Sequence, residues 1–182
     1  GSTAGQGQWS AFAASNGWQV TNEPLWGDHN NLDDPALHET LDWYFGLADK
    51  GYMPDYGQFN AAEGVNAQLA SGSAAMVLDG AWMISTYAAI EDFPVGTART
   101  PVGPDGTAKT MMNGLADSIV KDTDNPEGAA QWAAFMGSAQ CQQEVARAGV
   151  VFPSRQDATP LAAEAYRQMG IDPEPFIAPV QE

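Results

Sequence analysis

Residues 69–82 constrain the fold more than any other part of this 182-residue chain. Gly72 predicts the end of a helix, because glycine adopts at little cost the left-handed backbone angle that closes one. Residues 74–78 then read A-A-M-V-L, without a polar residue. An apolar run of this length is typical of a strand that is covered on both faces by helices. The sequence therefore predicts an α/β fold with 74–78 as a central strand.

A ligand site is predicted at the carboxyl end of this strand. Asp79 and Gly80 form the turn that follows, and residues 81–90 are expected to form a helix with Trp82 in its first turn. In open α/β sheets, ligands bind just outside the carboxyl ends of the strands. Trp82 and Asp79 are therefore candidate ligand-binding residues. The alternative for Trp82 is a place in the hydrophobic core.

Three short motifs occur in order along the chain. Residues 72–82 read G-S-A-A-M-V-L-D-G-A-W, residues 125–132 read N-P-E-G-A-A-Q-W, and residues 149–155 read G-V-V-F-P-S-R. They resemble the motifs G-x-x-A-M-x-x-x-G-x-W, N-P-E-x-A-x-x-F and G-x-x-P-x-R of the extracellular solute-binding proteins that supply sugars to ABC importers. Maltose-binding protein is the best-known member of that family, solute-binding family 1. The resemblance spans nearly the whole chain.

The resemblance implies a periplasmic-binding-protein-like fold, in which two lobes close on a ligand about a hinge. Residues 1–119 and 150–182 would form most of the carboxyl-terminal lobe, which would be incomplete. Residues 120–149 would be a short helical excursion into the amino-terminal lobe. An export signal and a large part of the amino-terminal lobe are expected upstream of these residues.

The resemblance also implies further ligand-binding residues. The segment 111–119 would cross between the lobes along the cleft floor, where Asn113 would meet a sugar hydroxyl and Gly114 would admit the ligand to the backbone. An ordinary strand with a bulge is the alternative for this pair. Gln6 and Gln8 would lie on the cleft wall, and their amides suit hydroxyl groups because they both donate and accept hydrogen bonds. The alternative for the glutamines is a frayed amino terminus.

The function that the resemblance implies is substrate capture without catalysis. The protein would be extracellular, as a membrane-anchored lipoprotein or in the periplasm, and would deliver a sugar or oligosaccharide to the membrane permease of an ABC importer. No catalytic residue, metal or cofactor is expected. Trp132, Phe135 and Met136 would lose their cover without the rest of the amino-terminal lobe, so self-association through them is expected.

Charge and composition narrow the ligand classes. The chain has 23 acidic and 7 basic residues and a net charge of −16, which argues against nucleic acid and anionic lipid as partners. Two alternative functions stay open: a binding protein of the same fold for a polyamine or an anion, and a fragment of a carbohydrate-active enzyme. His29 and His38 are predicted to be surface residues, and the single cysteine, Cys141, a small buried or half-buried residue.

Helical periodicity and capping residues complete the sequence-based prediction. Asp34 and Asn125 each precede a proline and are predicted to begin helices, as is Ser138. The tail beyond residue 170 has no periodicity and is expected to be loose. The predicted helices lie near residues 34–50, 60–71, 81–90, 126–136 and 138–148, with a last one over 159–170.

Overall fold

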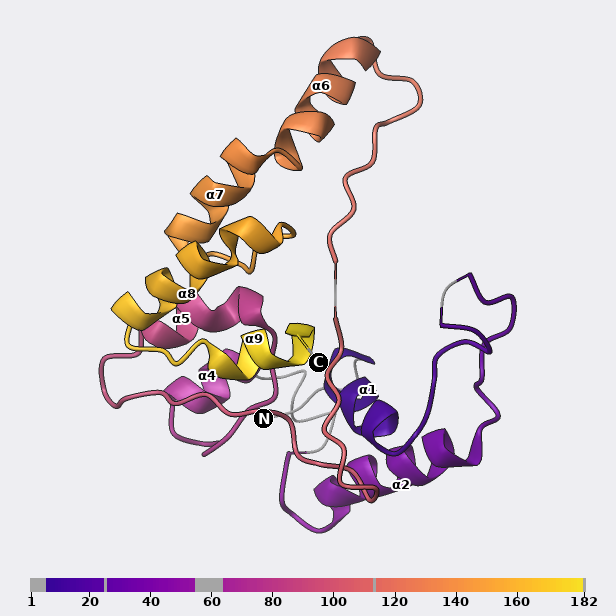
Figure 1. Ribbon diagram of the computed structural model, residues 1–182. Coiled ribbons are helices and arrows are strands. Elements are labelled where there is room, and N and C mark those ends of the chain that lie inside the picture. Colours follow the sequence, from indigo (N-terminus) through magenta and orange to yellow (C-terminus); the bar gives the residue numbers. More distant parts are fainter. Residues whose placement is uncertain (1–5, 25, 55–63, 113, 182) are drawn as a thin grey trace. The chain divides into compact units, whose positions relative to one another are not determined.

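The computed structural model describes residues 6–24, 26–54, 64–112 and 114–181 (Figure 1). Two compact units divide the chain. Unit 1 comprises the described residues of Gly1–Asp79, Ala98–Met111 and Gln181–Glu182, and unit 2 comprises those of Gly80–Thr97 and Met112–Val180. The helical elements are, in chain order, α1 (Gln6–Ser15), α2 (Pro35–Asp49), α4 (Val65–Ala70), η1 (Ala81–Met83), α5 (Ile84–Ala88), α6 (Pro126–Met136), α7 (Ala139–Ala148), η2 (Gln156–Ala158), α8 (Thr159–Gln168) and α9 (Glu174–Gln181).

Capping chemistry sets the helix ends where the sequence predicts them. Asp34 begins α2 by accepting a 2.8 Å hydrogen bond from the Ala36 backbone N–H. Asn125 begins α6 in the same way, and Ser138 begins α7. The helices expected near 34–50, 81–90, 126–136, 138–148 and 159–170 are confirmed. Of the helix expected over 60–71, residues 65–70 form α4, and residues 60–63 lie outside the described part of the chain.

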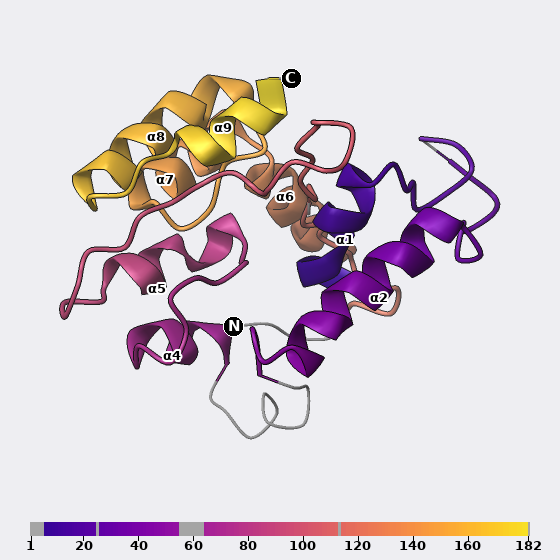
Figure 2. The ribbon, with the colours of Figure 1, turned by 90° about the horizontal axis from the view of Figure 1, so that it is seen from below.

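Unit 1 is organised by the packing of α1 on α2, which Figure 2 shows side by side. The buried residues between them are Ala13, Trp18 and Leu37. Trp18 is held by a 2.8 Å hydrogen bond from its indole N–H to the Asn31 carbonyl. The segment 98–111 is fixed to the end of α1, because the Lys109 backbone N–H donates to the Ser15 hydroxyl at 2.9 Å.

Unit 2 has its core where α5, α7 and α8 meet. The α7 and α8 helices pack side by side (Figure 1). The fully buried residues of this cluster are small alanines around one large side chain, that of Tyr166. The buried members are Ile84, Ala146, Ala158, Ala162, Tyr166 and Ile171.

The return segment after α7 is tied to its neighbours on both sides. Gly149 closes α7 in the left-handed conformation at φ +63°, as predicted for a helix end. The Ser154 backbone N–H donates to the Gln142 side-chain oxygen at 2.8 Å. The Arg155 guanidinium donates two 3.0 Å hydrogen bonds to Asp157, which lower the pKa of that exposed carboxyl. Ser154 and Arg155 of the motif at 149–155 therefore stabilise the local structure of this return segment.

The central, doubly covered strand predicted at 74–78 is not seen in the described residues. Within the described residues there is no β-strand, and the β-pairing found there is one bridge between Thr21 and Asn30. Residues 74–78 are without regular structure, and Met76 is 83% exposed. A strand is stable only when a ladder of backbone hydrogen bonds joins it to another segment, and the described residues form no such ladder here. The α/β class is consequently not seen in the described residues.

The prediction of a loose tail is wrong. Residues 174–181 form α9, and its Phe176 packs against the core cluster of unit 2. The Phe176 and Phe152 rings lie 6.0 Å apart between centroids. Full burial of an aromatic side chain is worth about 1.5–3 kcal/mol, and the half-buried Phe176 gains part of this when the helix docks.

Candidate functional site

Trp82 lies in η1, at the start of a helical segment whose other side is buried. Ile84 and Tyr87 of α5 are 3% and 8% exposed, and Ala81 packs against the core cluster of unit 2. These residues fix the backbone on both sides of Trp82. Because they occupy the inner face, the Trp82 side chain is left 48% exposed. The structure therefore removes the core alternative for Trp82, and its indole is accessible to a ligand.

Gly80 provides the surface against which the Trp82 indole lies. A Cβ atom built on Gly80 would fall less than 3.0 Å from three atoms of the six-membered ring, Cε3, Cζ3 and Cη2. No real Cβ makes contacts that short, so the ring occupies the space that a side chain at position 80 would need. One part of the indole is thus covered by the Gly80 backbone while half of the side chain stays exposed.

The predicted glutamines both lie in the first turn of α1, in unit 1. Gln6 is exposed and Gln8 is half-buried. The helix buries its other face through Ser10 and Ala11, among others. Met111 packs against this turn, because its sulfur accepts a 3.2 Å hydrogen bond from the Ser10 hydroxyl. The first turn of α1 is therefore helical and anchored, and the alternative of a frayed terminus does not hold from residue 6 onward.

The remaining predicted site residues lie on extended backbone. Asp79 is half-buried and belongs to unit 1, whereas Gly114 is exposed and belongs to unit 2. No atom of the described residues beyond its chain neighbours lies within 4 Å of a Cβ built on Gly114, so these residues leave its backbone open to approach. Asn113 lies outside the described residues. The structure brings Gln6 and Gln8 into one turn, and the ligand role of each predicted residue stays a prediction.

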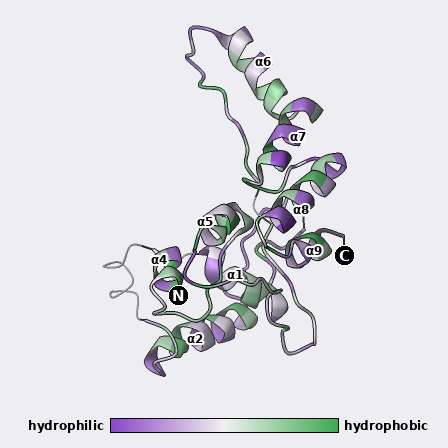
Figure 3. Ribbon diagram, turned by 90° about the vertical axis from the view of Figure 1, so that its left-hand side faces the viewer, coloured by the Kyte–Doolittle hydropathy of each residue, from purple (hydrophilic) through white to green (hydrophobic). Residues whose placement is uncertain are grey.

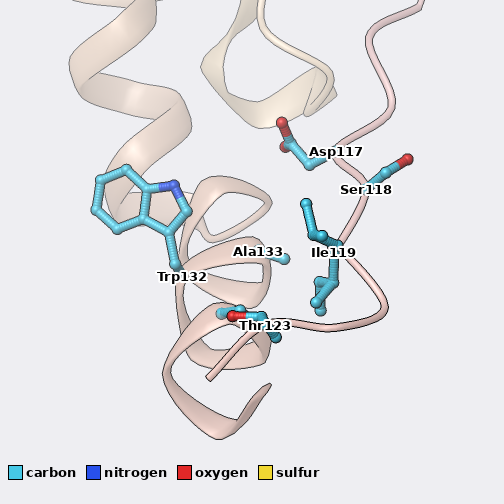
Figure 4. Close-up of a pocket in the computed structure, with 8 residues that line it drawn as sticks. Asp117, Ser118, Ile119, Thr123, Trp132 and Ala133 are labelled. Carbon is cyan, nitrogen blue, oxygen red and sulfur yellow. The ribbon is translucent and has the colours of Figure 1, made fainter. Parts of the chain in front are cut away.

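An open groove of about 330 Å³ lies in unit 2, between the extended segment before α6 and α6 itself. Figure 4 shows Ala133 pointing toward Ile119, with Asp117 and Ser118 further along the extended segment. Figure 3, coloured by hydropathy, shows that α6 includes apolar residues. Trp132 is 63% and Phe135 40% exposed, and their rings lie 5.8 Å apart. The sequence identified this apolar face but not the groove, which depends on two segments meeting in space.

The described residues contain neither a metal-binding cluster nor a membrane-spanning helix. Among them, no group of three or more His, Cys, Asp or Glu side chains is placed to hold a metal ion. His29 and His38 are exposed, and Cys141 is buried, as predicted. No helix within the described ranges has the length and apolar character needed to span a bilayer.

The family assignment comes from comparison with known proteins. A model of the bacterial extracellular solute-binding protein family matches residues 1–169. The chain belongs to this family. Members of the family bind solutes, so the prediction of a binding protein rather than an enzyme is supported at the level of the family. The extracellular location is supported at the same level.

A solved structure supports the fold of this solute-binding chain. The monoclinic crystal form of UspC from M. tuberculosis is similar to it with a TM-score of 0.68 and 20% sequence identity. The similarity covers 97% of this chain and 44% of UspC, so the chain spans less than half of that protein's length. At this identity the comparison shows the fold alone, which is solute-binding-protein-like. No curated protein matches the chain.

Proposed function

We propose that this protein captures a sugar or oligosaccharide outside the cell and delivers it to the membrane permease of an ABC importer. The family supports the capture of a solute. The observation that supports a sugar as the ligand is the position of Trp82, whose indole lies against Gly80 and which is 48% exposed. The apolar face of a pyranose ring stacks on such a surface, and a rigid aromatic floor with a few polar groups is the usual form of a small-molecule site.

Polar groups elsewhere in the chain are proposed to bind the sugar hydroxyls. The candidates are the amides of Gln6, Gln8 and Asn113, the carboxylate of Asp79 and the open backbone at Gly114. Amide and carboxylate oxygens accept hydrogen bonds from hydroxyls, and the amides also donate. Binding would trap the sugar by closure of two lobes, with no chemical step.

The fold and location of the whole protein are part of the proposal. We propose that it is an α/β protein in which 74–78 pairs as a strand, because an apolar run that leaves Met76 83% exposed favours a covering partner. Residues 1–119 and 150–182 would belong to one lobe and 120–149 to the other. The structure describes α7 packed on α8, and α6 without a buried residue. The proposed boundaries lie near residues 119 and 149, so limited proteolysis at these two places is their direct test. A lipid anchor or a periplasmic location would keep the protein beside its permease.

A cationic ligand such as a polyamine is the second candidate. The net charge of −16 favours it, because an acidic surface raises the local concentration of cations. A thermal-shift screen of sugars, polyamines and anions separates the candidates. Stabilisation by sugars alone supports the proposal, and stabilisation by polyamines alone replaces it. Turnover of a sugar substrate would instead indicate a carbohydrate-active enzyme.

Substitution of Trp82 tests the sugar site directly. In the complete gene product, we expect Trp82→Ala to weaken sugar affinity by about 1–3 kcal/mol while changing stability less. Trp43→Ala is the matched control, because Trp43 is 47% exposed and contacts Phe12 edge-on at 5.2 Å. It removes an indole of equal exposure outside the proposed site, so calorimetry is expected to find wild-type affinity. Unchanged affinity in Trp82→Ala would end the proposal for this residue.

A further inference from the structure

We infer that Gly80 positions the Trp82 indole, and that its lack of a side chain is what this position requires. The inference rests on the proposed function in one respect, the use of the indole as a ligand floor. Its geometric part stands on the contacts of the two residues alone. A Cβ atom at position 80 would lie less than 3.0 Å from three atoms of the indole ring, so the ring occupies the place of a side chain.

The requirement for glycine at position 80 is one of space and not of backbone angle. Gly80 has φ −98° and ψ 163°, an extended conformation that every residue adopts. Other glycines of the chain differ in this respect. Gly72 and Gly149 have φ of +71° and +63°, so the backbone alone explains them. Gly96 has no positive φ, and a Cβ added there would meet no described atom within 4 Å, so neither backbone angle nor space requires glycine at this position.

A side chain at position 80 would displace the indole more readily than the backbone. Ala81 packs against the core cluster of unit 2, and Ile84 is 3% exposed, so the backbone on both sides of Trp82 is held in place. The indole itself is half exposed and can rotate toward solvent about its side-chain bonds. Gly80→Ala therefore turns the ring out of its present position, and the face offered to a ligand changes with it.

Fluorine NMR of protein labelled with 5-fluorotryptophan tests the geometric part without any ligand. The six tryptophans of the chain give six resonances, and a Trp82→Phe variant identifies that of Trp82. We expect Gly80→Ala to shift or broaden the Trp82 resonance while the other five stay in place. Gly96→Ala adds the same methyl group where nothing lies within 4 Å, and all six resonances are expected to stay. An unmoved Trp82 resonance in Gly80→Ala overturns the inference.

Calorimetric titration with maltose as the probe tests the consequence for binding. We expect Gly80→Ala to lower maltose affinity by about tenfold, and the Gly80→Ala/Trp82→Ala variant to bind no more weakly than Trp82→Ala alone. Additive losses in the double variant would overturn the inference, since Gly80 would then act by another route. If Trp82→Ala leaves maltose binding unchanged, or maltose does not bind the wild type, the proposed sugar site fails and the NMR result still decides the role of Gly80. If Gly80→Ala does not fold, recovery of folding in the double variant supports the inference and its absence overturns it.

Discussion

Removal of the Tyr166 hydroxyl is expected to stabilise the protein, which is the reverse of most core substitutions. Tyr166 is fully buried in the core cluster of unit 2, and its ring meets Phe152 edge-on at 5.0 Å. Its hydroxyl oxygen is buried without a hydrogen-bond partner among the described residues. Tyr166→Phe keeps the ring and its packing and deletes only the unpaired group.

The magnitude follows from the cost of that group. A buried polar group without a partner costs about 1–3 kcal/mol, so Tyr166→Phe is expected to raise the free energy of unfolding by roughly 1 kcal/mol or more. A second consequence appears at high pH, because burial raises the pKa of the Tyr166 phenol from 10.0 to about 12. The folded state then holds its proton more tightly than the unfolded state. Stability is therefore complete below about pH 10 and is lost progressively between about pH 10 and pH 12, by roughly 3 kcal/mol.

Urea unfolding from pH 7 to pH 11 measures both effects. The Tyr166→Phe variant is expected to be more stable at pH 7 and to lose less stability above pH 10 than the wild type. Tyr52→Phe is the control, because Tyr52 is 79% exposed, and it is expected to match the wild type at every pH. A loss of about 1 kcal/mol or more in Tyr166→Phe at pH 7 would show that the hydroxyl has a partner, such as an ordered water, and would refute the reasoning.

Two further predictions concern the end of α7 and the exposed face of α6. Gly149→Ala is expected to lower the free energy of unfolding by about 1–2 kcal/mol, because φ is +63° there and the new methyl group would press on Met169. Gly96→Ala is the control in the same urea titration, and its free energy of unfolding is expected to stay close to that of the wild type. This chain is expected to associate with a second copy through the exposed rings of Trp132 and Phe135, so light scattering is expected to give a mass that rises with concentration and falls back to the monomer in Trp132→Ser. A monomeric wild type at all concentrations would contradict the second prediction.

The sequence determined the helix ends because the signals that set them are local. Asp34 and Ser138 accept hydrogen bonds from the first turns that follow them, and Gly72 and Gly149 take the left-handed angle that closes a helix. Each signal involves residues within a few positions of one another, so it can be read without knowledge of the rest of the fold. The family motifs were readable for the same reason.

The candidate site was readable only in part. The sequence identified Trp82 and placed it at the start of a helix, but left its burial open. In the structure, Ile84 and Tyr87 occupy the buried face of this helical segment, so the Trp82 side chain is left half exposed. The glycine of the G-x-W motif was visible as letters, but its purpose was not, because the contact with the indole depends on the side-chain conformation of Trp82.

Tertiary structure decided everything that needed a partner distant in the sequence. The apolar run 74–78 has the composition of a strand, but a strand forms only where another segment pairs along its backbone, and the described residues supply no such ladder. The tail forms the helix α9, whose Phe176 packs against the cluster around Tyr166. The sequence of the tail has no periodicity that indicates this contact. Pairing and docking depend on which surfaces meet in space, and a pattern of nearby residues does not contain that information.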